Sequence, residues 1–363
     1  MKKMTQFAAT LGALALTATS AQAAGVERST QSAAILFETG NMIEFSLGRV
    51  SPSVSGTLGA VPTVTSRDMA KTYLQLGGAL KYKINNRLDA AIIIDQPFGA
   101  DVAYPVGTGY PLAGSTAELN SFSVTGLVKY RTPSNISVYG GLRYQTMEAF
   151  ASLTTTTPYN VTSKKDGGLG YVLGVAYELP EIALRMALTY NSKIKHKIAT
   201  LEGGLLATTT NVNSPQSVNL EFQSGVAANT LVYGSARWVE WSKFEIAPAG
   251  YVGAVGRPLV SYPKNATAFN LGVGRKLNDT WSVSASVGYE KAWGGPSSNL
   301  GPTDGRKSLT LGAVYKLGNM KITGGVSYIR VGNTLTESNP GSRLGNFNDN
   351  KVIGVGVKVG YSF

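Results

Sequence analysis

Lys351-Val352-Ile353-Gly354-Val355-Gly356-Val357-Lys358-Val359-Gly360-Tyr361-Ser362-Phe363 ends the chain and alternates strictly in character. From Ile353 onward every odd-numbered position is apolar, and every even-numbered position is glycine, lysine or serine. Successive side chains of a β-strand point to opposite faces, so this segment predicts a strand with one apolar face and one small or polar face. The same period-two pattern recurs at 281–290 and 182–191.

Period-two alternation continues through most of the chain and predicts fourteen strands. They lie at 43–51, 70–84, 87–96, 119–131, 135–147, 167–179, 181–198, 216–227, 229–246, 266–276, 280–291, 306–317, 320–333 and 351–363. Short turns alternate with long loops rich in Gly, Pro, Ser and Thr, as in an up-and-down barrel with tight turns on one rim. Several strands reach the roughly nine to eleven residues that cross a bilayer obliquely. The sequence predicts an all-β fold, a fourteen-stranded antiparallel transmembrane β-barrel over 42–363.

A soluble secreted sandwich or a β-solenoid would also alternate, but two features favour a membrane barrel. Tyrosine and tryptophan on the apolar faces gather near strand ends, where amphipathic rings meet the membrane–water interface. The chain also ends in Phe363, in register with the apolar face, and we expect this last strand to engage the barrel-assembly machinery. A closed barrel leaves no backbone edge unpaired in hydrocarbon.

Composition narrows the function classes. Charged residues make up 15% of the 363 residues, against roughly 25% in a typical soluble domain, which fits a cytosolic enzyme poorly. The chain has no cysteine and one histidine, so we expect neither a metal site nor a cofactor. The net charge is +12, but the Lys and Arg residues are scattered rather than clustered in a run. This favours a basic face toward outer-membrane lipid and lipopolysaccharide, or an anionic ligand, over nucleic acid.

The first residues have the features of a secretory signal peptide. Lys2 and Lys3 precede a short apolar stretch, and Ala21-Gln22-Ala23 is a small-residue cleavage site, so 1–23 is the predicted signal peptide. The apolar stretch is too short to span a bilayer. Both ends of the barrel lie beside the short-turn rim. With periplasmic turns, the N- and C-termini face the periplasm and the long loops face outward.

Residues 24–41 precede the first strand and do not alternate. Their apolar triplet Ile35-Leu36-Phe37 would be costly to leave in water, so we expect this segment to fold into the lumen as a hatch. The alternative is a mobile leader that packs nowhere in particular.

The chain resembles the FadL family of outer-membrane transporters of long-chain fatty acids and hydrocarbons in Gram-negative bacteria. The matching stretches are Ala24-Gly25, Val50-Ser51-Pro52-Ser53-Val54-Ser55-Gly56, Pro215-Gln216-Ser217-Val218, Trp238-Val239-Glu240-Trp241-Ser242-Lys243-Phe244, Asp304-Gly305-Arg306 and Tyr361-Ser362-Phe363. The resemblance implies a monomeric fourteen-stranded barrel with an N-terminal hatch and passive uptake of hydrophobic molecules. It also implies capture among the outer loops, binding in the lumen, and lateral release through a wall gap at a kink in the third strand.

The third predicted strand, 87–96, runs into Pro97 and Gly99. Proline cannot donate to the ladder and glycine weakens it, so a lateral opening is expected there. The alternative is that Pro97 merely ends the strand. The family's hatch commonly carries an Asn-Pro-Ala motif where this chain has Ile35-Leu36-Phe37, so the hatch is shortened.

Candidate ligand contacts follow from the proposed route. The hydrophobic contacts predicted in the hatch and outer loops are Ile35, Leu36, Phe37, Phe150, Leu153, Leu201, Leu205 and Leu206. Strand parity places Lys129, Arg143 and Arg185 on the lumen face, where they could bind a carboxylate. The alternative is that these cations pair with lumen acids such as Asp89 or Glu290. A hydrocarbon would need no cation, which leaves the ligand class open.

Two other functions compete with hydrophobic uptake. A general diffusion porin for small polar solutes would conduct well, whereas a barrel plugged by an apolar triplet would not. A barrel enzyme would use His196, which lies between Lys195 and Lys197 with no Ser or Asp motif tied to it. We therefore expect a surface histidine and no enzyme.

Overall fold

The computed structural model describes residues 26–363, with the exception of 156, 157 and 340. The predicted signal peptide and the first two residues after it lie outside this part of the chain. No helix within the described residues has the length and apolar character needed to cross a membrane.

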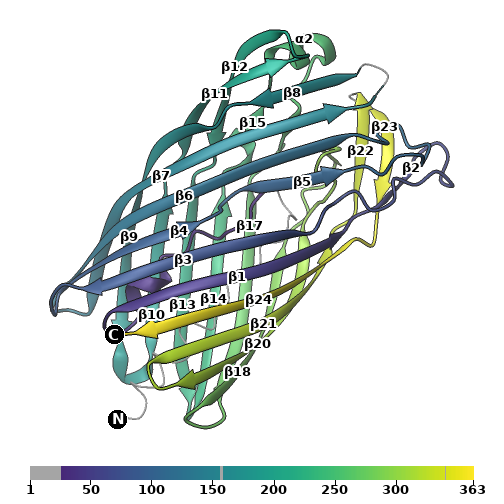
Figure 1. The fold of residues 1–363 in the computed structure, drawn as a ribbon. Helices are drawn as coiled ribbons and strands as arrows, with labels where there is room; N and C mark the ends of the chain where they lie inside the picture. Colours follow the sequence, from purple (N-terminus) through teal and green to yellow (C-terminus); the bar gives the residue numbers. More distant parts are fainter. Residues whose placement is uncertain (1–25, 156–157, 340) are drawn as a thin grey trace.

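Fourteen strands of the described chain close into one antiparallel barrel (Figure 1). In order around the wall they are β1 (Met42–Ser53), β3 (Tyr73–Lys83), β4 (Leu88–Asp95), β6 (Thr116–Arg131), β7 (Ile136–Leu153), β9 (Asp166–Leu179), β10 (Leu184–Asn191), β13 (Ser217–Ala227), β14 (Thr230–Val239), β17 (Ala266–Lys276), β18 (Trp281–Glu290), β20 (Arg306–Leu317), β21 (Met320–Val331) and β24 (Lys351–Ser362). The last strand closes on the first, from Met42↔Ser362 to Ser53↔Lys351. Each of the fourteen predicted segments overlaps one of these strands, so the predicted barrel is confirmed.

The alternation of β24 is visible in its burial. Ile353, Val355 and Val357 are exposed on the outer wall, whereas Val352 and Gly354 are buried on the lumen side. In a membrane barrel such an outward apolar row meets acyl chains. The C-terminal end lies beside a short turn, where Ser362 N donates to Asn319 O at 3.0 Å.

The long loops contain shorter elements that build up the opposite rim. They are β2 (Gly56–Leu58), β5 (Gly99–Ala103), β8 (Tyr159–Ser163), β11 (Ile194–Glu202), β12 (Leu206–Ser214), β15 (Glu245–Ile246), α2 (Ala249–Val255), β16 (Val260–Ser261), β19 (Pro296–Ser297), β22 (Thr334–Asn339) and β23 (Ser342–Phe347). Of these, β11 and β12 form a hairpin that also pairs with β8. β2, β19, β22 and β23 form a separate small sheet.

Two predicted strands are too long. The segment 181–198 is divided, because β10 ends at Asn191 and β11 begins at Ile194. Gly168 and Gly170 of β9 let β11 pass close by, since a Cβ at either position would meet Ile194 at about 2.5 Å. Both strands alternate, so the sequence pattern hides the break. The segment 229–246 stops at Val239, because Trp241 and Phe244 turn inward and become fully buried.

Residues 26–41, the N-terminal segment, lie inside the barrel (dark purple in Figure 1). The short 3-10 helix η2 (Ala34–Phe37) packs Ile35 and Leu36 against lumen-facing residues of the wall. The Phe37 ring meets Tyr139 edge-on at 5.7 Å. This packing removes most of the apolar surface of the triplet from water, which is favourable for large apolar side chains.

Candidate functional site

An apolar cavity of about 50 Å³ lies in the outer half of the barrel. Alternate residues of β6 and β7 supply one wall and the β11–β12 hairpin another, while residues flanking α2 cover it and Val26 forms its inner end. Its lining includes Val26, Ala100, Ala117, Leu119, Met147, Ala149, Ala151, Val161, Ile198, Val212, Ile246, Pro248, Leu259, Val260, Tyr262 and Leu300. No Lys, Arg or His side chain of the described residues lines it.

Aromatic rings surround the inner and lateral sides of this apolar cavity. The Trp241 ring meets Phe98 at 6.0 Å and Tyr262 at 5.2 Å between ring centres. Tyr262 in turn contacts Trp293 at 5.7 Å. Tyr262 lies in an outer loop, and burial raises the pKa of its hydroxyl well above the usual range. The surroundings of the cavity therefore have a low polarity that suits an apolar ligand.

One carboxylate fastens the cover of the apolar cavity. Glu202, at the end of β11, accepts hydrogen bonds from the backbone N–H groups of Gly250 (3.0 Å) and Tyr251 (2.9 Å) in α2. The hydroxyls of Tyr159 and Thr208 also donate to Glu202, each at 2.7 Å. Burial acts to raise the pKa of Glu202, but these four hydrogen bonds outweigh it and leave the pKa below its ordinary value. Glu202 therefore joins three outer segments while ionised.

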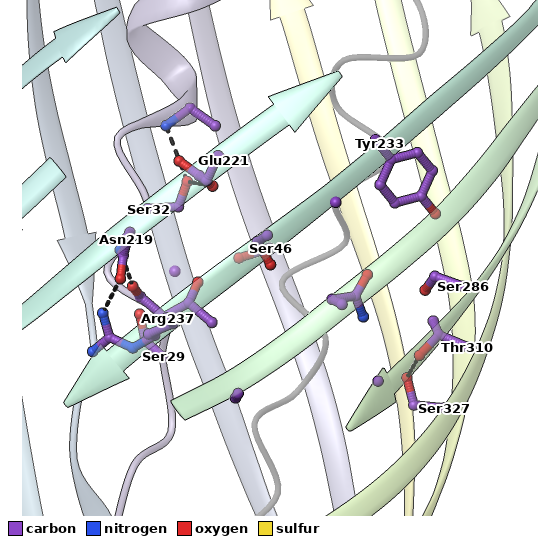
Figure 2. A pocket seen from close by; sticks show the side chains of 18 of the residues that line it. Ser29, Ser32, Ser46, Asn219, Glu221, Tyr233, Arg237, Ser286, Thr310 and Ser327 are labelled. Atoms are coloured by element: carbon purple, nitrogen blue, oxygen red, sulfur yellow. Dashed lines mark hydrogen bonds between the residues drawn. The ribbon is translucent and has the colours of Figure 1, made fainter. Parts of the chain in front are cut away.

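A second, polar cavity of about 250 Å³ lies nearer the middle of the lumen (Figure 2). Small hydroxyl side chains of β18, β20 and β21 line one side, namely Ser284, Ser286, Ser308, Thr310 and Ser327. The N-terminal segment supplies the other side through Ser29 and Ser32. The lumen thus changes from apolar near the outer loops to polar toward its middle.

Polar contacts fix the N-terminal segment to the wall. Arg237 donates to Glu27 Oε1 through Nε at 2.9 Å, and Ser32 donates to Glu221 Oε1 at 2.7 Å (Figure 2 shows Ser32 beside Glu221). Arg143 Nη1 donates to Gln31 Oε1 at 2.8 Å. The buried charges of Glu27 and Arg237 thereby pair with each other, as buried charges require.

The barrel wall is interrupted between β3 and the strands that follow it. β4 pairs with β3 only as far as Gly78↔Ile94 and ends at Asp95, while β5 pairs with β6 instead. Beyond Gly78 the Leu76 N–H donates to the side chain of Gln96 at 3.0 Å rather than to a backbone carbonyl. Backbone pairing resumes where Lys71 N donates to Asp101 O at 3.0 Å. We call this interruption the wall gap.

The N-terminal segment closes the wall gap from the lumen side. Pro97 O accepts from the N–H of Arg28 at 2.8 Å, and Gly99 N donates to Val26 O at 2.7 Å. Arg28 needs a glycine at position 99, because a Cβ there would lie 2.4 Å from its Nε. The predicted break at Pro97 and Gly99 therefore coincides with the end of β4 and with the contact to the N-terminal segment.

A third, smaller cavity of about 70 Å³ lies at the wall gap. Lumen-facing Ser29, Gln75 and Asp95 line it together with Leu47 and Leu76, which belong to the outer, exposed face. The cavity is thus lined by residues from both faces of the wall.

The structure does not gather the predicted hydrophobic contacts in the apolar cavity. Ile35, Leu36 and Phe37 do not line the apolar cavity; Ile35 lines the polar cavity instead, and Ile35 and Leu36 are buried against other lumen-facing residues of the wall. Leu201, Leu205 and Leu206 are exposed, Leu205 to 92%. Phe150 borders the cavity but is itself 37% exposed, and Leu153 is buried beyond it. Their role in binding stays a prediction.

Sequence reasoning missed the residues that do line the apolar cavity. Ala117, Leu119, Met147, Ala149 and Ala151 occupy lumen positions of β6 and β7 near their outer ends. At the same strand ends the outward positions include Glu118, Asn120 and Glu148. The alternation continues but its apolar side changes from the outer to the lumen face, and this reversal was the available signal.

The three predicted carboxylate-binding cations all face the lumen but differ in their partners. Lys129 Nζ lies 3.5 Å from Asp89 and 3.7 Å from Glu178. Arg143 bonds Thr125, Gln31 and Asn191. Arg185 lies over the Phe37 ring at 4.8 Å and lines the polar cavity. Their binding of a ligand carboxylate stays a prediction.

The expectation of a surface histidine is wrong. His196 is buried on the inward face of β11, with Nδ1 3.3 Å from Asp166 Oδ2. It lies in an outer loop, and burial lowers its pKa, while Asp166 acts in the opposite direction. The alternation of β11 places it inward between exposed Lys195 and Lys197, a register that depends on where β11 begins. The described residues hold no group of three or more His, Cys, Asp or Glu that could bind a metal ion.

Comparison with known proteins connects this geometry to a family. The family model described as outer membrane protein transport protein (OMPP1/FadL/TodX) matches residues 37–363. The chain belongs to this OMPP1/FadL/TodX family. It is accordingly an outer-membrane transport barrel of a Gram-negative bacterium, and the resemblance seen in the sequence is confirmed. No curated protein matches the sequence.

Solved structures of OMPP1/FadL/TodX proteins share the fold at low sequence identity. A Pseudomonas aeruginosa FadL homologue matches with a TM-score of 0.75 and 16% identity, over 91% of this chain and 92% of the other. The P. putida toluene transporter TodX matches at 0.65 and 12%, over 91% and 92%. The Ralstonia pickettii toluene transporter TbuX matches at 0.62 and 14%, over 96% and 97%.

Proposed function

We propose that the protein takes up small, uncharged hydrophobic molecules passively across the outer membrane. The apolar cavity under α2 binds the molecule, and the wall gap beside β3 releases it sideways into the membrane. The observation that carries this proposal is the adjacency of the two features. Val26 and Ala100 line the cavity, and the same short segments meet at Gly99 beside the gap.

The cavity lining favours a neutral substrate over a fatty acid. A carboxylate buried among apolar side chains is costly unless a cation or several hydrogen-bond donors meet it. No cationic side chain of the described residues lines the apolar cavity. Arg185 lines the polar cavity, together with Ser29 and Ser32, and not the apolar cavity. Two structural relatives are described as toluene transporters, which agrees with an uncharged hydrocarbon.

Binding requires the cover of the cavity to move. An engineered cavity of about 150 Å³ accommodates benzene, whereas the apolar cavity measures about 50 Å³. Additional space must come from the outer segments, and Glu202 is the group that joins them. A ligand that displaces α2 breaks the hydrogen bonds from Gly250 and Tyr251.

The N-terminal segment acts in this proposal as the hatch. It closes the wall gap through Arg28 and lines the polar cavity through Ser29 and Ser32. Both chain ends lie at the short-turn rim in the periplasm, and the long loops with α2 face outward. The barrel works as a monomer surrounded by outer-membrane lipid and is inserted by the barrel-assembly machinery through the strand that ends at Phe363.

Filling the apolar cavity tests the proposal. Ala149→Phe places a ring in the cavity, whereas Ala313→Phe places the same ring on the lipid-facing side of β20. We expect the first variant to lose most toluene uptake into cells lacking the wild-type gene, and the second to retain it. Heat-dependent gel mobility verifies that both barrels fold. Equal uptake by the two folded variants would overturn the assignment of the cavity.

One observation favours a second function, diffusion of small polar solutes. The polar cavity is larger than the apolar one and is lined by hydroxyl groups. A porin would show large, steady single-channel conductance in planar bilayers and no dependence of toluene uptake on Ala149. Conductance that stays small until residues 26–41 are deleted would support the hatch instead.

A further inference from the structure

A row of three cations crosses the outer wall on adjacent strands. Lys307 of β20 is paired in register with Arg330 of β21, and Arg330 is paired with Lys351 of β24. All three alternate with lumen-facing neighbours and are exposed on the outer face. They lie at the long-loop ends of their strands, which run together along one side of the barrel (Figure 1).

Such a row is unfavourable without an anion. Directly opposed residues of antiparallel strands have Cα atoms about 4.5–5.5 Å apart, and like charges in this position repel one another. Arg330 has one partner, Asp349 at 2.7 Å, and this pair is exposed. Among the described residues neither Lys307 nor Lys351 has an ion pair. Elsewhere among the long loops, by contrast, Lys71 and Lys165 lie near carboxylates.

The surroundings of the row indicate what kind of anion it meets. One step toward the membrane centre, the outward positions on the same three strands are Leu309, Tyr328 and Ile353, which are also in register and exposed. The cations therefore stand at the edge of the lipid-facing apolar surface, where an aromatic side chain marks the interface. A soluble anion would use the charges and leave the apolar row unused, whereas an amphiphile uses both.

We propose that Lys307, Arg330 and Lys351 bind the phosphate groups of a phosphorylated glycolipid, the lipopolysaccharide of the outer leaflet. Its phosphates lie on the cation row, and its acyl chains lie along Leu309, Tyr328 and Ile353. Arg49 of β1, exposed opposite Val355, extends the basic surface to the neighbouring strand. In this proposal the long Arg49 side chain reaches from the apolar band toward the headgroups. The site rests on the outward orientation of the long loops proposed above, but not on the transport route.

Titration of the purified full-length protein in detergent with lipopolysaccharide tests this site. The variant Lys307→Ala/Arg330→Ala/Lys351→Ala removes the row. The matched control Lys83→Ala/Arg275→Ala/Lys316→Ala removes two lysines and one arginine, all exposed at the short-turn rim. Each cation near an anionic lipid surface contributes enough that losing three should weaken binding roughly a hundredfold, while the control stays close to wild type.

Several outcomes would overturn the site. Equal weakening in both triple variants would show a general effect of charge. Undiminished binding by the row variant, or by wild type to dephosphorylated lipopolysaccharide, would show that phosphate recognition lies elsewhere. Competition by millimolar inorganic phosphate would show a site for the free anion. Toluene uptake by the row variant, with normal heat-dependent gel mobility, should remain intact, so failure of this site is distinguishable from failure of the proposed transport function.

Discussion

The guanidinium of Arg28 lies over the ring of Tyr73, with its carbon 4.0 Å from the ring centre. Arg28 belongs to the N-terminal segment, and Tyr73 begins β3 at the edge of the wall gap. The Arg28 carbonyl also accepts from the side chain of Gln75 on the same strand. Arg28 thereby connects β3 to Pro97 across the gap, because its side chain and carbonyl contact β3 while its backbone N–H donates to Pro97 O. The Nε of the Arg28 side chain has no hydrogen-bond partner among the described residues.

Removal of Arg28 should open the wall gap. A desolvated cation–π contact contributes about 2 kcal/mol, so Arg28→Ala should raise the rate of toluene uptake by up to roughly thirtyfold. Arg28→Lys retains the charge over the ring and should give an intermediate rate. Arg275→Ala, at the exposed short-turn rim, is the control and should not differ from wild type. Unchanged or slower uptake by folded Arg28→Ala would show that Arg28 does not close the route.

Gly99 should act through Arg28. A methyl group at position 99 meets the Arg28 side chain at 2.4 Å, so Gly99→Ala must displace that flexible side chain. We expect faster uptake, with no further increase when Gly99→Ala is combined with Arg28→Ala, because contacting residues are not additive. Gly126→Ala is the matched control, since a Cβ there has no neighbour within 4 Å. Additive effects of the two substitutions would contradict the contact.

The stability of the cavity's cover should depend on pH through Glu202. The pKa of Glu202 is lowered in the folded protein, so its carboxylate stabilises the cover of the cavity above the ordinary glutamate pKa of about 4.3. This stabilisation is lost as the pH falls below that value and through the lower pKa of the folded state. The protection of residues 249–255 against hydrogen exchange, measured relative to intrinsic exchange at the same pH, should therefore fall once the pH drops below about 4.3.

Glu202→Gln should show the reduced protection of residues 249–255 already at pH 7, because a neutral amide accepts weaker hydrogen bonds than a carboxylate. Glu148→Gln, the same charge change at a partly exposed residue of β7, serves as the control. Protection in Glu202→Gln that stays high at pH 7 would assign the cover of the cavity to other contacts.

The barrel wall was predictable because each crossing strand meets lipid on one face and the lumen on the other. Alternation located all fourteen strands, and the Pro97–Gly99 pair located the interruption in the wall. The ends of 181–198 and 229–246 were not predictable, because an alternating strand can leave the wall without a change of pattern. Ile194 passes close to two glycines of a strand distant in sequence, and nothing local records that approach.

The binding cavity was harder to predict than the wall. Its lining combines strand ends with loop residues such as Ile246 and Leu259, which meet only after the outer segments fold over the barrel. Long apolar residues in loops drew attention to Leu201 and Leu205, yet these side chains point outward. Hydrophobicity identifies a residue that prefers contact with other apolar groups, but it does not say which contact it finds.

Reversible cross-linking of the wall gap tests the central claim most directly. The chain contains no cysteine, so Leu76→Cys and Gln96→Cys introduce a unique pair beside the gap, where Leu76 N and Gln96 Oε1 are 3.0 Å apart. A bifunctional thiol reagent that forms disulfides joins them, and a reductant releases them. The control pair Leu311→Cys and Val326→Cys is directly opposed in the intact wall. We predict that toluene uptake stops on cross-linking of the gap and returns on reduction, with no effect in the control; full uptake by the cross-linked protein would contradict lateral release.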